Sequence, residues 1–366
     1  MIDKMKILFL APANNYHTKK WCKWFSERGH QISVISLTPA DEDIAADVFY
    51  LETQANSLSA DMKKISYLTT IEKIRHIIKN TSPEVIVAHY ASSYGSLAAL
   101  SVKRKYFLFV WGSDIYTFPN KSLLHKMLLK FCLYRAGYLC STSEAMAIEA
   151  SKYTSRKFSI IPFGVDIGMF NNKLRNRKNN DDFIIGTVKS LSPDYGIDYI
   201  LKAVAIIREK YPYIPIKVRI AGKGTHEKIY KQLANDLDIA DCVSWLGFIS
   251  QKEAAIEWAN MDCGVIPSRS ESFGVSAVEA QACGCPVIVS DLPGLMEATC
   301  PNKTSIVTKN GDVDNLVESI KFLYDFPAVR KTMGEMGRKY VVEKYDIEKC
   351  FSKAEKMFYY RKIGND

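Results

Sequence analysis

Short runs of Val, Ile, Leu and Phe recur along the chain and alternate with amphipathic segments. In the first half, the runs that predict strands lie at 7–12, 32–37, 85–90, 106–111, 138–142 and 158–162. In the second half, similar runs lie at 183–188, 216–222, 243–248, 263–267, 286–291 and 305–309. Continuous apolar runs of this kind are typical of strands that are buried on both faces.

The amphipathic segments between these runs, such as 198–211 and 313–326, predict helices that connect parallel strands. Each half is therefore predicted to form a doubly wound, Rossmann-like α/β domain. Ligands of such domains bind beyond the carboxyl ends of the strands. Two domains that face each other are expected to place a central cleft between those ends.

The polar stretch 171–182 has no apolar periodicity, which is typical of a linker. We therefore expect an N-terminal domain at 1–170 and a C-terminal domain at 183–340, joined by a linker at 171–182. A C-terminal helix within 341–366 is expected to cross back to the first domain. The length of 366 residues supports two domains rather than one.

Composition adds several expectations. No apolar run approaches the roughly 18 residues of a membrane-spanning helix, and the opening MIDKMKILFLAP is too strand-like for a signal peptide. We therefore expect a cytoplasmic protein. The nine cysteines are scattered, and Cys283 and Cys285 have no second pair at metal-ligand spacing. This pattern indicates buried thiols rather than a metal site.

Charge is distributed unevenly between the halves. Residues 1–180 carry 25 basic and 14 acidic side chains, a net charge of +11, whereas residues 181–366 have a net charge of −2. A basic half fits an anionic partner, namely nucleic acid, anionic lipid or a phosphorylated ligand, and equally fits a solvated surface. No helix-turn-helix or stacking-aromatic pattern accompanies the charge, so nucleic acid is not expected.

One basic segment has two interpretations that the sequence leaves open. In the stretch 121–138, Lys121, Lys126, Lys130 and Arg135 stand among Leu, Met and Phe. A helix of this kind is typical of a protein that lies on anionic lipid, at the inner face of a membrane. The alternative is a crossover helix that packs on its own sheet.

Two carboxylates eight positions apart, Glu271 and Glu279, flank a predicted helix start in SRSESFGVSAVEAQACGCPVIVSD. Ser272 and Gly274 favour the start, and VSAVEAQA favours helix interior. The backbone N–H groups near 272–275 are expected at this helix N-terminus, and such an N-terminus is an anion site that suits a phosphate. With an acid on either side of it, this arrangement suggests a nucleotide diphosphate, with sugar hydroxyls at one carboxylate and the transferred group near the other. The alternative is a helix with one N-terminal acid and one solvent-facing Glu.

The chain resembles the retaining glycosyltransferases of family 4, the group 1 glycosyl transferases, which have the GT-B fold. The E-x7-E formed by Glu271 and Glu279 is the signature of that family. Similar segments cover nearly the whole chain and lie at 17–36, 88–95, 111–115, 160–170, 195–203, 221–224, 245–248 and 310–320.

The resemblance implies a donor site in the second half. Glu279 is expected to bind the ribose of the nucleotide, and Glu271 to orient the hydroxyls of the transferred sugar. The backbone near Gly247 and Phe248 is expected to hold the base. The expected contacts to the diphosphate come from the backbone N–H groups around Ser272, Phe273, Gly274 and Val275.

In the first half, the resemblance implies that His89 lies near the donor sugar and the reaction centre. The alternative for His89 is a histidine that caps a buried strand end. Asp114 and Ser113 are expected on a loop after a strand, where acceptor contacts fall. The alternative for Asp114 is an N-cap carboxylate.

The chain departs from the family in the loop TVKSLSPDYGID. The position of the family's Arg holds Ser190, and that of its Lys holds Tyr195. A leaving diphosphate still needs a cation, and we expect Lys189, with Lys223 as the second candidate. No D-x-D motif follows a strand, so no metal and no cofactor are expected.

These features predict a hexosyl- or N-acetylhexosaminyl-transferase that uses a nucleotide-sugar, preferably a UDP-sugar, and retains the anomeric configuration. The expected acceptor is a glycan or a lipid-linked intermediate of surface polysaccharide synthesis. The alternatives are an inverting GT-B glycosyltransferase, a nucleotide-sugar epimerase and a non-catalytic nucleotide-sugar-binding subunit.

Overall fold

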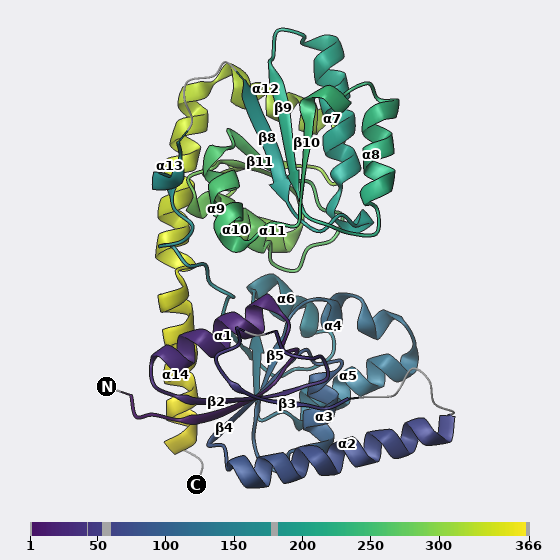
Figure 1. Cartoon of the computed structure of the whole chain (residues 1–366), viewed down its shortest axis with the longest axis vertical. Coiled ribbons are helices and arrows are strands. Elements are labelled where there is room, and N and C mark those ends of the chain that lie inside the picture. The colour runs from purple at the N-terminus through teal and green to yellow at the C-terminus, as the bar shows by residue number, and fades with distance from the viewer. Residues whose placement is uncertain (1, 42, 53–59, 177–181, 364–366) are drawn as a thin grey trace. The chain divides into compact units, whose positions relative to one another are not determined.

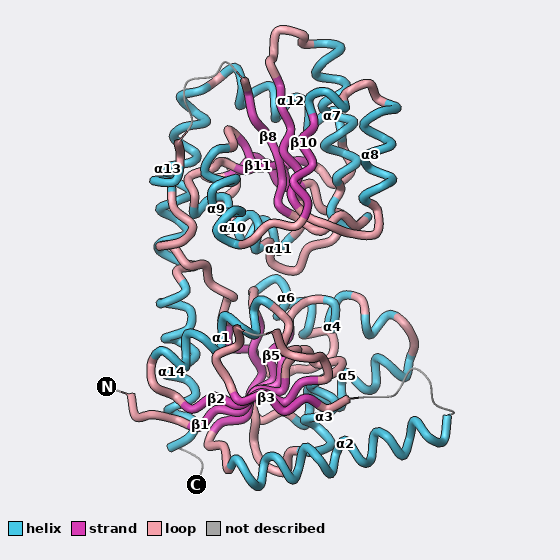
Figure 2. Tube along the Cα trace, viewed as in Figure 1, coloured by secondary structure: helices cyan, strands magenta, loops and turns pink. Residues whose placement is uncertain are grey.

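The computed structural model describes residues 2–41, 43–52, 60–176 and 182–363, which form two compact units (Figure 1). The first unit consists of Met1–Phe163 with Cys350–Asp366, and the second of Gly164–Lys349. Within each unit, the strands lie between layers of helices (Figure 2). Of the predicted linker 171–182, residues 177–181 lie outside the described residues, and 171–176 belong to the second unit.

The first unit holds a parallel sheet, which in the described residues has the order β3-β2-β1-β4-β5-β6-β7. Its strands are β1 (Lys6–Leu10), β2 (Gln31–Ser36), β3 (Asp47–Tyr50), β4 (Val85–His89), β5 (Phe107–Val110), β6 (Tyr138–Ser141) and β7 (Phe158–Ile160). Every strand except β3 coincides with a predicted run. β3 lies at the sheet edge and is partly exposed, so its sequence lacks the continuous apolar pattern of a buried strand.

The two faces of this sheet bury different side chains. Aliphatic residues such as Leu8 and Leu108 belong to the core that includes residues of α2 (Ala60–Thr81), α3 (Tyr94–Ser101) and α5 (Leu123–Arg135). Aromatic residues lie on the other face, where the Trp21 ring of α1 (Tyr16–Glu27) lies 4.4 Å from the ring of Phe351 in α14 (Ile347–Ile363).

A buried hydrogen-bond chain also attaches α14 to the first unit. Nδ1 of His30 accepts a hydrogen bond from the backbone N–H of Met5 at 3.0 Å. The other ring nitrogen therefore carries the proton, and it donates to Oε1 of Glu355 at 2.8 Å. This chain links the start of β1, the residue before β2 and α14.

The other helical elements of the first unit are α4 (Ser113–Tyr116), η1 (Phe118–Asn120) and α6 (Glu144–Ala150). In the described parts of the whole chain, no helix combines the length and the apolar character that crossing a bilayer requires.

The second unit holds another parallel sheet, with the order β10-β9-β8-β11-β12-β13 in the described residues. Its strands are β8 (Phe183–Val188), β9 (Ile216–Ala221), β10 (Val243–Gly247), β11 (Cys263–Ile266), β12 (Val287–Ser290) and β13 (Ser305–Thr308). All six described strands coincide with predicted runs. Two Rossmann-like α/β domains are thus confirmed.

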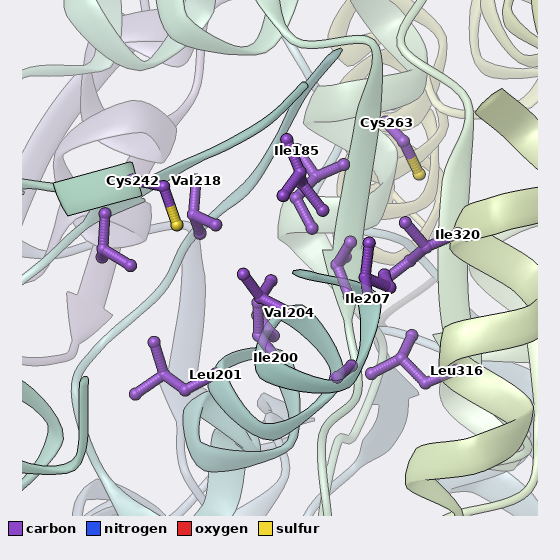
Figure 3. Packing of buried hydrophobic residues seen from close by; sticks show 14 of the residues in the cluster. Ile185, Ile200, Leu201, Val204, Ile207, Val218, Cys242, Cys263, Leu316 and Ile320 are labelled. Carbon is purple, nitrogen blue, oxygen red and sulfur yellow. The ribbon is translucent and has the colours of Figure 1, made fainter. Parts of the chain in front are cut away.

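Helices cover both faces of the second sheet. They are α7 (Ile197–Lys210), α8 (Glu227–Asp236), α9 (Gln251–Asn260), α10 (Val275–Ala282), α11 (Pro293–Ala298), α12 (Val313–Asp325) and α13 (Pro327–Lys344). Short 3-10 turns are η2 (Asn172–Leu174), η3 (Pro193–Tyr195) and η4 (Ala240–Cys242). Figure 3 shows the core on one face, where Ile185 of β8 packs with Val204 of α7 and Ile320 of α12.

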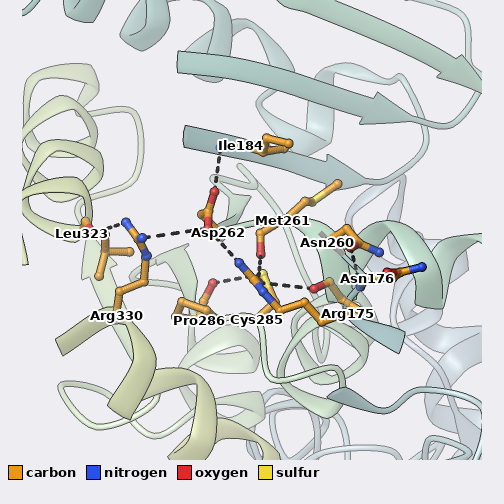
Figure 4. Close-up of polar contacts among 11 residues, drawn as sticks. Arg175, Asn176, Ile184, Asn260, Met261, Asp262, Cys285, Pro286, Leu323 and Arg330 are labelled. Carbon is orange, nitrogen blue, oxygen red and sulfur yellow. Dashed lines mark hydrogen bonds and ion pairs between the residues drawn. The ribbon is translucent and has the colours of Figure 1, made fainter. Parts of the chain in front are cut away.

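A buried carboxylate fixes the start of this second sheet (Figure 4). Asp262, which is 6% exposed, accepts a hydrogen bond from the backbone N–H of Ile184 at 2.9 Å. It also accepts one from the Arg175 guanidinium at 3.0 Å, and the Arg330 guanidinium lies 3.9 Å away. Arg175 follows η2, and Asp262 directly precedes β11. The contacts of Asp262 therefore attach the segment after η2 to the starts of β8 and β11.

We expect Asp262→Ala to lower the free energy of unfolding of the second unit by about 3 kcal/mol, because it leaves buried donors unpaired. Amide hydrogen exchange along β8 measures this effect. Asp236→Ala is the matched control, because Asp236 is exposed at the end of α8, and a change within about 0.5 kcal/mol is expected. Equal exchange in both variants would contradict the role of Asp262.

Candidate active site

The carboxyl ends of β8 and β11 define the candidate donor site of the second unit. β8 has β9 on one side and β11 on the other, so the connections from these strands lead to opposite sides of the sheet. Such a topological switch point is where open α/β sheets bind ligands. The loop after β8 carries Lys189, and the loop after β11 carries Glu271 and leads into α10.

Lys189 and Glu271 form an ion pair between these loops, and each side chain is 11% exposed. Burial opposes the charge on Lys189, but Glu271, Tyr195 and Glu279 together raise its pKa above the ordinary lysine value. Lys189 is therefore an ammonium ion that is largely shielded from water. The sequence predicted this lysine for the diphosphate, and the structure places it against Glu271. Its catalytic role stays a prediction.

Helix α10 begins at Val275, as predicted. Its N-cap, Gly274, has φ of 97° and ψ of 50° and supplies no side-chain hydrogen bond to the first turn. The first N–H groups of a helix have no acceptor within the helix, and they favour an anion. The hydroxyl of Ser276 donates to the backbone carbonyl of Val188 at 2.9 Å, which places the first turn beside the end of β8.

Glu279 lies one turn further along α10 and is 6% exposed. This position corrects one alternative from the sequence, a solvent-facing Glu. The charge of Glu279 contributes to the raised pKa of Lys189, so the two groups are electrostatic neighbours. Ser272 and Phe273 lead into the helix, and the Phe273 ring is buried 5.2 Å from the ring of Tyr345. Phe273 as a whole is only 2% exposed, and the contact of its backbone N–H with a diphosphate stays a prediction.

The loop 221–224 packs on the loop after β8. Gly222 has φ of 138°, and a Cβ there would overlap the backbone carbonyl of Lys189. The N–H of Gly222 donates to the carbonyl of Gly247 at 2.7 Å, which brings the end of β10 to the same edge. Lys223 and Phe248 both have exposed side chains. The structure therefore gathers the predicted donor residues at one edge of one sheet.

His89 ends β4, which lies beside β1 at the switch point of the first sheet. It is fully buried among aromatic rings, with its ring centroid 4.6 Å from that of Trp111 and 5.5 Å from that of Phe9. Among the described residues, neither ring nitrogen has a hydrogen-bond partner. Burial lowers the pKa of His89 to about 3, so the imidazole is neutral.

A second histidine lies near His89 and was missed by the sequence analysis. His17, in the first turn of α1, stacks on the ring of Phe163 with centroids 3.9 Å apart. Burial, Lys20 and His89 lower its pKa well below the ordinary value. Nδ1 of His17 is buried without a hydrogen-bond partner in the described part of the chain. The only indication in the sequence was the position of His17 directly after the loop that follows β1.

Asp114 differs from its predicted setting. It lies in the first turn of α4 rather than on a loop, and it is fully buried. Its carboxylate accepts hydrogen bonds from the backbone N–H groups of Ala91, at 2.8 Å, and Gly112, at 2.7 Å. Burial raises the pKa of Asp114, and these hydrogen bonds oppose the shift. The carboxylate therefore joins the ends of β4 and β5, whereas Ser113 beside it is exposed.

Helix α5 packs on its own sheet, which is one of the two interpretations that the sequence left open, and it also exposes an apolar surface. Its inner side packs on the sheet through Leu129, Cys132 and Leu133. Its outer side exposes large apolar side chains, which are Leu123, Leu124, Met127, Phe131 and Tyr134. Arg135 belongs to neither set, because its guanidinium donates to the carbonyls of Ala99 and Val102, both at 3.2 Å.

Within the described ranges, no group of three or more His, Cys, Asp or Glu side chains could hold a metal ion. The expectation of a reaction without metal or cofactor stays a prediction.

Comparisons with known proteins identify the family of the chain. Residues 170–340 match the family Glycosyl transferases group 1, and residues 6–143 match Glycosyl transferase 4-like. The chain is 30% identical over 212 residues to a D-inositol 3-phosphate glycosyltransferase of Pseudarthrobacter chlorophenolicus, covering 54% of the chain and 50% of that protein. The chain thus spans half the length of that relative.

Two further similarities extend over more of the chain. The capsular polysaccharide biosynthesis glycosyltransferase CapM of Staphylococcus aureus is 25% identical over 293 residues, which cover 73% of the chain and 74% of CapM. The fold matches that of Anabaena HepE, solved in complex with UDP and glucose, with a TM-score of 0.79 and 17% identity. That match covers 96% of the chain and 99% of HepE.

We expect His89 to make the stability of the first unit depend on pH. An unfolded histidine, with a pKa near 6.5, binds a proton that folded His89 excludes down to about pH 3. Stability therefore falls as pH drops below about 6.5, by up to about 1.4 kcal/mol per pH unit from this group. His89→Phe should remove that part of the slope, as measured by amide exchange along β4 between pH 7 and 5. An unchanged slope would contradict the assignment.

Proposed function

We propose that this chain, which belongs to the group 1 glycosyltransferases, transfers a sugar from a nucleotide-sugar to an acceptor hydroxyl. Its first half matches the Glycosyl transferase 4-like family, which supports the same activity. The observation that carries the proposal is the Lys189–Glu271 ion pair beside the N-terminus of α10. A cation, the amides at a helix N-terminus and two carboxylates suit a diphosphate with a sugar at each end.

In this proposal the second unit binds the donor. Lys189 and the first amides of α10 stabilise the negative charge that develops on the leaving diphosphate. Glu279 binds the ribose, and Glu271 orients the hydroxyls of the transferred sugar. The backbone near Gly247 holds the base. The preferred donor is a UDP-sugar, which gains support from the UDP complex of HepE.

The first unit supplies the acceptor side. His89 is a neutral imidazole, so it can accept a hydrogen bond from a hydroxyl or donate one, without adding charge at the reaction centre. The transition state is oxocarbenium-like, and the anomeric configuration is retained. The acceptor is a glycan or a lipid-linked glycan of surface polysaccharide synthesis, and the similarity to CapM supports this choice.

We expect Lys189→Ala and Glu271→Gln each to lower turnover about 100-fold or more, because each removes a preorganised group at the transferring centre. Turnover is measured with UDP-, GDP- and ADP-sugars as donors. Lys217→Ala is the matched control, because Lys217 is exposed on β9, and its turnover should equal that of the wild type.

The products of the same reactions separate the alternatives. NMR of the product anomer distinguishes a retaining from an inverting enzyme. Donor conversion without any acceptor would indicate an epimerase, and nucleotide-sugar binding without turnover would indicate a binding subunit. Full turnover in both Lys189→Ala and Glu271→Gln would contradict the proposed site.

We further propose that the outer side of α5 contacts an anionic membrane that carries the acceptor. Its exposed apolar side chains include Leu123 and Leu124, each 73% exposed, and Tyr134, 78% exposed. Lys126 and Lys130 are exposed between them, and residues 115–143 contain no Asp or Glu. Apolar side chains interleaved with lysines match the interface of an anionic bilayer in both polarity and charge.

Lysines near an anionic surface contribute about 1 kcal/mol each, so Lys126→Glu with Lys130→Glu should weaken vesicle binding about 30-fold or more. The measurement is sedimentation with phosphatidylserine-containing vesicles at low and high salt. Leu124→Glu with Met127→Glu should weaken binding at both salt concentrations. Ile148→Glu is the control, because Ile148 is 69% exposed on α6 and lies outside this surface. No sedimentation of the wild type at low salt would refute membrane contact.

A further inference from the structure

We infer that Tyr195 is a positioning residue of the donor site, whose aromatic ring holds the Lys189 ammonium where a diphosphate can reach it. The inference rests on the proposed function, because it concerns the same anion-binding edge of the second unit. The Tyr195 ring is uncharged, and it would be a further member of the site beside the Lys189 ammonium, the carboxylates and the amides of α10.

The contact between Tyr195 and Lys189 has the geometry of a cation–π interaction. Nζ of Lys189 lies 4.4 Å from the centroid of the Tyr195 ring. The same ammonium is ion-paired with Glu271, and the Lys189 side chain is only 11% exposed. Attraction between an ammonium and an aromatic face is strongest where water is excluded. The ring and the carboxylate therefore restrain the end of a long, flexible side chain.

The backbone that carries Tyr195 is fixed against the loop that leads to Glu271. Tyr195 ends the turn η3, and the next residue, Gly196, has φ of 65°. A Cβ at Gly196 would overlap the carbonyl of Pro267, so the two loops are in direct contact there. The Arg269 guanidinium donates to the carbonyl of Pro193 at 2.7 Å.

A second set of contacts extends this attachment. The backbone N–H of Arg269 donates to the carbonyl of Asp194 at 2.7 Å, and its guanidinium binds both carboxylate oxygens of Asp198, at 2.9 and 2.7 Å. Tyr195 and Glu271 thus stand on two loops that are joined by hydrogen bonds. The hydrogen-bonded backbone of these loops therefore fixes the positions from which the side chains of Tyr195 and Glu271 contact Lys189.

The chemical type of the side chain at position 195 follows from the charges around it. Glu271 already pairs with Lys189, and Glu279 adds a further negative charge nearby. Another carboxylate would neutralise the ammonium and repel a diphosphate. An aromatic ring attracts the ammonium through its quadrupole and carries no net charge, so the ammonium stays available to an anion.

The test is calorimetric titration of the full chain with UDP, GDP and ADP and with the nucleosides uridine, guanosine and adenosine. Tyr195→Leu should weaken binding of the preferred diphosphate about 2- to 30-fold, the range that a lost cation–π contact implies. Tyr195→Phe keeps the ring and should bind within about twofold of the wild type. Nucleoside affinity should be the same in all three proteins, because nucleosides lack the diphosphate.

Two further variants guard against misfolding. Tyr195→Gln is a second ring-free variant, and Tyr213→Leu is the matched control, because Tyr213 is 57% exposed and lies before the start of β9, at the end of that strand opposite the loop 221–224. Circular dichroism and the thermal midpoint show whether each variant is folded. A folded ring-free variant should lose diphosphate affinity, whereas Tyr213→Leu should not.

The outcomes separate this inference from the proposed function. If the wild type binds none of the diphosphates, the proposed function is wrong. If it binds one and a folded ring-free variant binds it equally well, the role of Tyr195 alone is wrong. An equal loss in Tyr195→Phe, or an equal loss of nucleoside affinity, would also overturn the inference, because the ring–ammonium contact explains neither result.

Discussion

The ion pair between Lys189 and Glu271 is the interaction on which the donor site depends. It joins the loop after β8 to the loop after β11, at the point where the strand order reverses. Each side chain has lost most of its contact with water, so either charge alone would be strongly unfavourable. The ion pair therefore holds the ammonium and the carboxylate beside the first turn of α10. A diphosphate that enters this edge meets charges that are already oriented.

The sequence predicted the architecture well because its signals are local. Parallel strands buried on both faces need continuous apolar runs, and β8 was predicted with the bounds that the structure gives it. Helix α10 lies over the segment VSAVEAQA that was predicted as helix interior. β3 was missed because an edge strand of four partly exposed residues lacks such a run. Asp114 was expected on a loop because the short helix α4 has no hydrophobic period to indicate it.

The sequence itself indicated only the part of the site that one segment carries. Glu271 and Glu279 stand on either side of one helix start, which indicated an anion site, whereas most residues on the other loops were expected from the family resemblance. The contact of Lys189 with Tyr195 was not predictable, since it depends on the turn η3 and on its attachment to the loop 267–270. His17 was missed for a similar reason. Its relation to His89 arises when β1 and β4 become neighbours in the sheet.

The two sheets present different chemistry at equivalent edges. The switch point of the second sheet carries an ammonium, two carboxylates and helix amides, which suit a charged diphosphate. The switch point of the first sheet carries two imidazoles, and burial among aromatic rings keeps both neutral. Aromatic packing around His89 and His17 therefore does more than fill a core: it keeps these two imidazoles uncharged, so that each can donate or accept a hydrogen bond without adding charge at this edge of the first sheet.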